Sequence, residues 1–393
     1  ALYASIERDP SRHLHLYTAV TLAPPGGGKG LEARFIRPFV QRHFGDDFPR
    51  LAYVQALKRN ALPANMEVEE FYMQSGALLH STQAQRRYAS LNYTHVARAL
   101  GDRGVNAIVQ KVARSADGSR LSLSCNTDLT FDAIDALVAR GLPRPLLVAE
   151  VDPELPWLGG SASVEAGFFD IVVTPPGPYP KLFGLPRQPV SDADYAIGFH
   201  ASTLVLDGGT LQIGIGALAD ALCHALALRH TDNAAYRRVL RALGAAKAGD
   251  LALGPFVEGL YGCSEMINEG FRRLVEVGVI RRKVVDDEAL MRRVDSGHAS
   301  DDDLMRVENG GEFLHGAFYL GSPEFYQWLR NLPEDQCRGI GMKRVSEVNE
   351  LYGSNESLER LQRRRARFFN TCMMGTALGA AGSDALENGR VLS

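Results

Sequence analysis

Short apolar runs alternate with amphipathic stretches along most of this chain. Strand-like runs occupy residues 13–22, 105–112, 121–125, 146–150 and 169–174, and stretches with the apolar spacing of helices occupy 31–43, 96–100 and 131–140. Strands that alternate with helices in this way are typical of parallel βαβ units. The pattern therefore predicts the α/β class, with open, mainly parallel sheets that helices cover.

A stretch rich in proline and glycine interrupts this pattern. Residues 175–189 include Pro175-Pro176-Gly177-Pro178 and Gly184-Leu185-Pro186, which favour neither a helix nor a central strand. A helical pattern at 192–202 then opens a second series of α/β elements. We therefore predict two α/β domains, at residues 1–185 and 190–393, and we expect the charged stretch at 281–309 to be a solvated insertion.

Composition narrows the class of protein. The 393 residues carry 45% hydrophobic and 23% charged side chains, as is usual in soluble globular proteins, and the formal net charge of −3 argues against a nucleic-acid-binding surface. No apolar run approaches the roughly 20 residues that cross a bilayer, so we expect no membrane partner. The 5 cysteines are far apart and form no C-x-x-C pair, which favours a cytoplasmic protein. The 10 histidines show no metal-ligand spacing, so we predict no metal and no tightly bound cofactor.

The first candidate site is a glycine turn. Gly214-Ile215-Gly216 follows a predicted strand and precedes an apolar helix at 217–228. Glycine lets the backbone approach a ligand closely, and the N–H groups at a helix start favour an anion or a developing oxyanion. With Ala219, the turn also satisfies the dinucleotide-binding pattern G-x-G-x-x-G/A. A tight turn with no ligand would explain the same residues.

The second candidate site is Glu265, in the run Gly262-Cys263-Ser264-Glu265-Met266. An apolar stretch at 251–262 precedes it and helical periodicity at 267–277 follows. We therefore expect Glu265 in the first turn of a helix, where the helix dipole favours its ionised form by about 0.3–1 kcal/mol. An ionised carboxylate in a partly dry site can attack an acyl thioester, although a helix-start glutamate with a capping role alone fits the same position. Cys263 is an alternative nucleophile, but no nearby base activates it, and we expect a small buried residue there.

The two candidate sites occur together in a known family. The glycine turn within 207–216 and the run 264–266, followed by 274–276 and 278–280, resemble segments of the acetyl-CoA hydrolase/transferase family, which includes 4-hydroxybutyrate and succinyl/acetate CoA-transferases. Weaker likeness to the family extends over residues 92–98, 104–106, 121–126, 318–321 and 325–326.

The resemblance implies two open α/β domains with the active site between them, and a homodimer. It implies that Glu265 attacks the carbonyl of an acyl-CoA and becomes a glutamyl-CoA thioester, which a small carboxylate resolves. Gly214, Ile215 and Gly216 would bind coenzyme A or the oxyanion, and Asn370 stands at a position similar to the family's active-site asparagine. Coenzyme A is then a substrate. A Gly-Val-Gly-Gly-Gln segment comes next in the family, so we expect the C-terminal domain to be truncated.

We therefore predict an acyl-CoA:carboxylate CoA-transferase. The alternatives are an acyl-CoA (acetyl-CoA) hydrolase that uses the same glutamate, a non-catalytic CoA-binding module and an NAD-dependent dehydrogenase. A transferase needs an added carboxylate for thioester loss and a hydrolase does not. The binding module has no turnover, and the dehydrogenase requires a nicotinamide.

Overall fold

The computed structural model describes all residues except 1, 27, 246–252, 351, 353–354 and 393. The chain forms two compact units. One contains residues 1–103 together with 372–393, and the other contains residues 104–371.

The first unit is built on a two-stranded parallel sheet of β1 (Leu14–Thr18) and β2 (Met66–Glu70). Its helices are α1 (Leu2–Arg8), α2 (Leu31–His43), α3 (Ala52–Lys58), α4 (Thr82–Arg86) and α5 (Tyr93–Asp102). The C-terminal segment, with β13 (Met374–Gly375) and β14 (Ala381–Gly382), belongs to this unit. It is attached there because the amide of Gln85 accepts from the Val391 N–H at 2.9 Å and donates to the Val391 carbonyl at 3.1 Å.

The second unit begins with a five-stranded mixed sheet of order β6-β4-β3-β5-β7. Strands β3 (Ala107–Arg114), β5 (Leu146–Val151) and β7 (Ile171–Val173) are parallel, and β4 (Arg120–Ser122) and β6 (Ser163–Glu165) join antiparallel. Helix α6 (Thr127–Val138) follows the short 3₁₀ turn η1 (Ser124–Asn126) and packs its Phe131 and Ile134 against the buried face of the sheet. Two more 3₁₀ turns, η2 (Gly160–Ala162) and η3 (Ala166–Phe168), flank β6.

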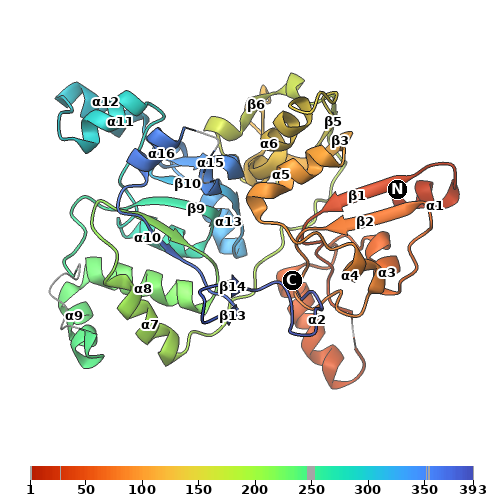
Figure 1. The fold of residues 1–393 in the computed structure, drawn as a ribbon, viewed down its shortest axis with the longest axis horizontal. Helices are drawn as coiled ribbons and strands as arrows, with labels where there is room; N and C mark the ends of the chain where they lie inside the picture. Colours follow the sequence, from red (N-terminus) through yellow and green to blue (C-terminus); the bar gives the residue numbers. More distant parts are fainter. Residues whose placement is uncertain (1, 27, 246–252, 351, 353–354, 393) are drawn as a thin grey trace. The chain divides into compact units, whose positions relative to one another are not determined.

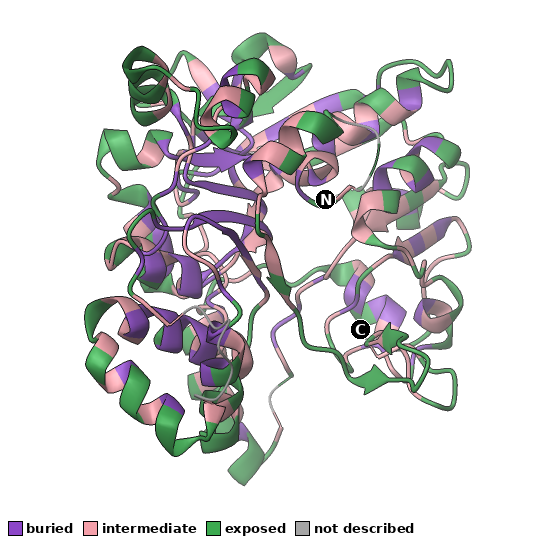
Figure 2. Ribbon diagram, turned by 60° about the vertical axis from the view of Figure 1, so that its left-hand side comes forward, coloured by how far each residue is buried: buried purple, intermediate pink, exposed green. Residues whose placement is uncertain are grey.

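The second sheet of this unit is entirely parallel and has the order β11-β10-β9-β8-β12. Its strands are β8 (Thr210–Ile213), β9 (Tyr261–Ile267), β10 (Leu314–Tyr319), β11 (Ile340–Met342) and β12 (Arg367–Phe369). The helices are α7 (Asp192–Ser202), α8 (Ala217–Thr231), α9 (Asn233–Ala242), α10 (Glu269–Glu276), α11 (Glu288–Asp295), α12 (Asp301–Gly310), α13 (Pro323–Arg330), α14 (Glu334–Arg338), α15 (Val345–Asn349) and α16 (Glu356–Gln362). Figure 1 shows α8 and α10 on one face of this sheet and α15 on the other. The central strands are buried on both faces (Figure 2).

The predicted α/β class with mainly parallel sheets is confirmed. Helices α2 and α7 have the predicted bounds, and residues 174–190 contain neither helix nor strand. The predicted domain boundary at 185–190 falls inside the second unit, between its two five-stranded sheets, and it stays a prediction. The charged stretch at 281–309 forms α11 and α12. Only α12 fits a fully solvated insertion, because it buries no residue whereas α11 buries Leu290 and Met291.

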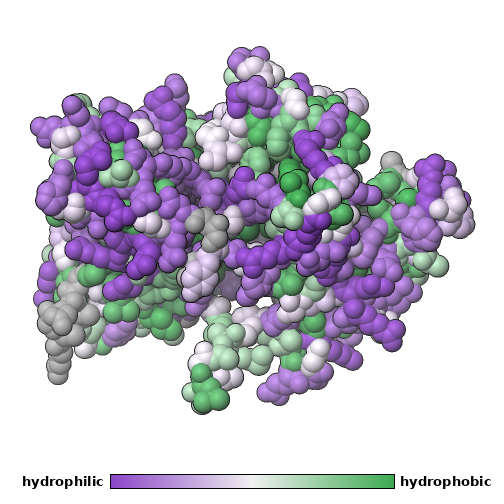
Figure 3. Space-filling model, turned by 45° about the horizontal axis from the view of Figure 1, so that its top comes forward, coloured by the Kyte–Doolittle hydropathy of each residue, from purple (hydrophilic) through white to green (hydrophobic). Residues whose placement is uncertain are grey.

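Apolar side chains remain exposed on one face of the mixed sheet. Val109, Leu146, Ile171 and Val173 share that face, and each is at least 44% exposed. The face of the molecule in Figure 3 is largely hydrophilic and carries several apolar areas. Among the residues that the structure describes, no helix is long and apolar enough to cross a membrane.

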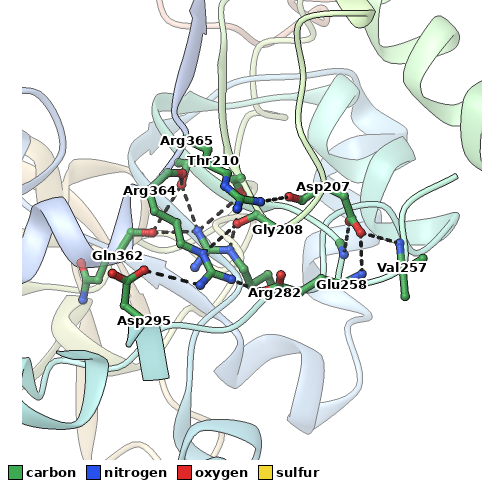
Figure 4. Close-up of polar contacts among 12 residues, drawn as sticks. Asp207, Gly208, Thr210, Val257, Glu258, Arg282, Asp295, Gln362, Arg364 and Arg365 are labelled. Carbon is green, nitrogen blue, oxygen red and sulfur yellow. Dashed lines mark hydrogen bonds and ion pairs between the residues drawn. The ribbon is translucent and has the colours of Figure 1, made fainter. Parts of the chain in front are cut away.

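A buried arginine ties the strands of the parallel sheet together at their amino ends. Arg282 is 8% exposed and donates to the Gly209 carbonyl at 3.4 Å, to the Thr210 hydroxyl at 3.0 Å and to the Gln362 carbonyl at 2.7 Å (Figure 4). Its guanidinium also lies 5.4 Å from the ring centroid of Tyr261, the first residue of β9. Burial lowers the pKa of Arg282 to about 10, so it remains charged at neutral pH. One side chain thus joins the start of β8, the start of β9 and the approach to β12.

We expect Arg282→Met to destabilise the protein by about 2–4 kcal/mol, because it leaves buried carbonyl and hydroxyl groups without a donor. Urea unfolding of the intact chain measures this. Arg365→Met is the matched control, because Arg365 is exposed and donates only at the rim of the same cluster, to the Asp207 carbonyl at 3.2 Å. The control should change stability by less than about 0.5 kcal/mol. Equal losses of unfolding free energy in the two variants would contradict the role of buried Arg282.

Candidate active site

Glu265 lies in strand β9, which corrects the expectation that it stands in the first turn of a helix. The strand continues to Ile267 because it pairs with β10 along its length, up to the pair Ile267 and Tyr319. Helix α10 begins only at Glu269, with Asn268 as its N-cap. The predicted stabilisation of the ionised carboxylate by a helix dipole is therefore wrong. The apolar stretch predicted at 251–262 starts outside the described residues, since 251 and 252 are not described.

The environment of Glu265 shifts its pKa upward. Burial raises the pKa of this carboxyl, and a hydrogen bond from the Asn349 side chain to its Oε2 opposes that shift. Asn349 is the last residue of α15, which packs against β9. Cys263, two residues earlier on the same strand, is buried, and burial raises the pKa of its thiol. The carboxylate is therefore the better nucleophile of the two, because a buried neutral thiol is unreactive.

The glycine turn has the predicted strand-to-helix geometry. It joins β8 to α8, and Gly216 is the N-cap with φ of +115°, a conformation that side chains other than glycine rarely adopt. An added Cβ at Gly216 would meet no atom within 4 Å, so the turn is open. Ile215 is 43% exposed beside it. The first N–H groups of α8 have no acceptor within the helix, so the turn can receive an anion or an oxyanion.

Two side chains from the β9 strand and its end hold the glycine turn in place. The Ser264 hydroxyl donates to the Ile213 carbonyl at 3.0 Å, and the Asn268 amide donates to the Gly214 carbonyl at 2.9 Å. Asn268 also caps α10 by accepting from the Gly270 N–H at 2.9 Å. The segment that carries Glu265 and the glycine turn are thus fixed against each other.

Asn370 lies on the other side of the glycine turn. It follows β12, which pairs with β8, and its Oδ1 accepts from the Gln212 side chain at 3.0 Å. The Gly214 N–H contacts the Phe369 carbonyl at 3.4 Å, and a Cβ at Gly214 would lie 4.0 Å from Asn370 Oδ1. The structure therefore brings all the predicted site residues to the carboxyl ends of three neighbouring strands, β9, β8 and β12.

The order in which the chain adds strands to this sheet also reverses at β8. The chain proceeds from β8 outward through β9, β10 and β11, and then returns to place β12 on the opposite side of β8. Open α/β sheets bind their ligands at such switch points, in the crevice outside the carboxyl ends of the strands. The order of the strands and the residues at their ends thus indicate the same location.

Asp232 and Arg364 make contacts within the protein. The acidic residue that a dinucleotide site requires should end a strand, but Asp232 lies between α8 and α9 and caps α9 by accepting from the Ala235 N–H at 2.9 Å. Arg364 pairs with Glu258 and donates to the Gly208 carbonyl at 3.1 Å. Among the described residues, no group of three or more His, Cys, Asp or Glu side chains could hold a metal ion.

The sequence reasoning missed Asn349. It lies 84 residues after Glu265 in the chain, and no local pattern marks it. It also missed Ser264 and Asn268 as supports of the glycine turn, although Asn268 followed by Glu269 is a recognisable helix-start signal.

Comparisons with known proteins identify a similar sequence and similar folds. No family model matches the chain. The 4-hydroxybutyrate coenzyme A transferase of Clostridium kluyveri is 30% identical over 138 residues, which are 35% of this chain and 25% of that protein. The predicted resemblance to the acetyl-CoA hydrolase/transferase family is therefore confirmed over the aligned residues.

Solved structures of RipA variants share the fold. One is 17% identical, aligns over 98% of this chain and 74% of its own, and has a TM-score of 0.56. A second, also 17% identical, aligns over 88% of this chain and 61% of its own with a TM-score of 0.53. The aligned part of this chain spans only a quarter of the curated relative's length.

The raised pKa of Glu265 predicts a pH-dependent stability. The folded protein holds this proton more tightly than the unfolded chain, so stability falls as pH rises from the ordinary glutamate pKa of 4.5 through the raised value. Glu265→Gln keeps an acceptor for Asn349 but cannot ionise. We expect it to stabilise the fold at about pH 8, by on the order of 1 kcal/mol, and to have little effect near pH 4.

Urea unfolding of both proteins at the two pH values measures this difference. Glu276→Gln is the control, because Glu276 is a partly exposed residue on α10 that pairs with Arg272 at 2.9 Å. A gain of equal size at both pH values, or a loss at the higher one, would contradict the burial of an ionisable carboxyl at position 265.

Proposed function

We propose that this protein is an acyl-CoA:carboxylate CoA-transferase that acts through a covalent glutamyl-CoA thioester on Glu265. One observation carries the proposal: a partly buried carboxylate, an open glycine turn at a helix start and Asn370 meet at the switch point of a parallel sheet. The name of the curated relative from Clostridium kluyveri supports the same class of reaction.

The reaction consists of four acyl transfers. The Glu265 carboxylate attacks the thioester carbonyl of an acyl-CoA and expels CoA thiolate, giving a mixed anhydride. The thiolate attacks the glutamyl carbonyl and expels the donor carboxylate, which leaves the glutamyl-CoA thioester. An acceptor carboxylate then attacks this thioester and releases the thiolate again. In the last step the thiolate attacks the acceptor carbonyl, which forms the new acyl-CoA and frees Glu265.

Each residue has a role that follows from its position. Burial makes the Glu265 carboxylate a poorly hydrated and therefore more reactive nucleophile once it is ionised. The open backbone at Gly214 and Gly216, at the start of α8, suits the negative charge that develops on a carbonyl oxygen or the phosphates of coenzyme A. The exposed side chain of Ile215 offers apolar contact to the thiol arm of coenzyme A. The amide of Asn370 suits a carbonyl or carboxylate oxygen of the substrate.

The glutamyl thioester can be trapped. Incubation with acetyl-CoA and then borohydride should reduce Glu265 to the alcohol, so that its peptide loses one oxygen and gains two hydrogens. The modification should require acetyl-CoA and should be absent in Glu265→Gln, which has no carboxylate to attack. Peptide mass mapping is the measurement, and Glu276→Gln should be labelled like the parent protein. An unmodified Glu265 in protein that demonstrably binds acetyl-CoA would overturn the proposal and favour a CoA-binding module.

The fate of the thioester separates transferase from hydrolase. We expect consumption of acetyl-CoA to depend on an added small carboxylate, such as succinate or 4-hydroxybutyrate, and to stop at the stoichiometric thioester without one. Loss of acetyl-CoA and appearance of the new acyl-CoA, followed by chromatography with and without the carboxylate, measure transfer, and release of free thiol measures hydrolysis. Steady thiol release with no carboxylate present would instead identify the acyl-CoA hydrolase that uses the same glutamate, with water as the final acceptor.

A further inference from the structure

Helix α15 is the element that brings Asn349 to Glu265, and it is too short to hold its own position. It has only 5 residues, and an isolated helix of this length is unstable in water. Val345 and Val348 pack into the core, and the Arg363 side chain donates to the Glu347 carbonyl within the helix. The position of the Asn349 amide therefore depends on polar contacts with neighbouring elements, and most of these lie at the start of the helix.

The contacts at the start of α15 converge on one carboxylate from another helix. Asp132, on α6, accepts from the Ser346 N–H at 3.1 Å and from the Ser346 hydroxyl at 2.8 Å. Arg344, the N-cap residue of α15, approaches the same carboxylate at 3.5 Å and lies 5.0 Å from the ring centroid of Phe131. The Asp132 side chain is only 11% exposed. A single buried carboxylate thus satisfies the start of α15, where unpaired N–H groups attract negative charge.

We infer that Asp132 is a positioning residue for Glu265: it fixes α15 and thereby holds the Asn349 amide against the Glu265 carboxylate. The inference deepens the proposed function and rests on it for its catalytic consequence. Its structural part concerns only residues of the second unit, since α6, α15 and β9 all lie within residues 104–371.

A neighbouring carboxylate offers a matched control. Asp135 is one turn further along α6 and also pairs with Arg344, but its side chain is 65% exposed and makes no contact with Ser346. Exposed pairs of this kind contribute little. Asp132→Asn and Asp135→Asn therefore remove the same charge from the same helix, and only the first changes the acceptor of the Ser346 N–H and hydroxyl.

Several ionisable groups lie on β9 and on elements near it, so the titration of Glu265 must be assigned. They lie on β9, β10, α15 and α6 and next to α15: Tyr261, Cys263, His315, Tyr319, Lys343, Arg344, Glu347, Asp128, Asp132 and Asp135. Burial raises the pKa of Glu265, and the Asn349 hydrogen bond lowers it by a smaller amount. Weakening that hydrogen bond should raise the pKa of Glu265 further, and a variant without Glu265 identifies its titration.

The side-chain amide of Asn349 reports this titration directly. In protein labelled with ¹⁵N-asparagine, the Asn349 signal is identified by its loss in Asn349→Ala, and its pH dependence should vanish in Glu265→Gln. We expect Asp132→Asn to move the midpoint upward by on the order of one pH unit, because a hydrogen bond to a charged group is weakened. Asp135→Asn should leave the midpoint in place. Ser346→Ala, which removes one of the bonds to Asp132, should give a smaller upward shift and serves if Asp132→Asn does not fold.

The catalytic consequence is measured by the rate of glutamyl thioester formation at a pH below the midpoint. There Asp132→Asn should slow the reaction by about tenfold with little change in KM for acyl-CoA. In the Asn349→Ala background the same substitution should have no further effect. A midpoint unmoved by Asp132→Asn and by Ser346→Ala, or losses that add in the double variant, would overturn the inference.

The Asn349 titration and the thioester assay test the inference and the proposed function separately. If the parent protein forms no glutamyl thioester, the proposed function fails, and the Asn349 titration still decides the role of Asp132. If the thioester forms normally and the titration ignores Asp132, the inference alone fails.

Discussion

The arrangement of the candidate site depends on one buried charge at the opposite end of the sheet. Arg282 joins the starts of β8 and β9 and the approach to β12. A buried guanidinium is costly unless its donors are satisfied, so its acceptors are held in a fixed geometry. Strands advance by a constant rise of about 3.3 Å per residue. A register fixed at the amino ends therefore determines which residues meet at the carboxyl ends, where Glu265, Gly214 and Asn370 lie.

The two ends of the same strands consequently have different roles. At the amino ends, Arg282 and the carboxylate of Asp207, which accepts three backbone N–H groups at 2.9–3.0 Å, satisfy polar groups internally. At the carboxyl ends, the turn at Gly216 leaves helix N–H groups without an acceptor and adds no side chain. Internal satisfaction stabilises the fold, and unsatisfied donors in an open turn are available to a ligand. This division explains why a change at Arg282 should affect the whole fold, whereas the glycine turn can serve chemistry.

Sequence reasoning found the elements whose signals are local. Helices α2 and α7 and the glycine turn were predicted because glycine and the apolar spacing mark them directly. It placed Glu265 in a helix because the strand signal and the helical signal overlap around Ser264. The strand continues through that residue because β9 pairs with β10, which lies about 50 residues further along the chain. Asn349 and Asp132 could not be predicted, because their roles arise from contacts across 84 and 214 residues of chain. The unit boundary at residue 103 depends likewise on tertiary contacts.

Burial of the proposed nucleophile has two opposing effects on its reactivity. Burial raises the pKa of Glu265, which disfavours the ionised form that attacks a thioester, yet full exposure would leave the carboxylate hydrated and less reactive. One hydrogen bond from Asn349 stabilises the charge without admitting water. Val345 and Val348 bury the apolar side of α15, and the polar contacts of this helix determine where the Asn349 amide lies. An anchor on α6 serves this purpose, because a carboxylate held by a separate helix fixes α15 independently of the strand that carries Glu265.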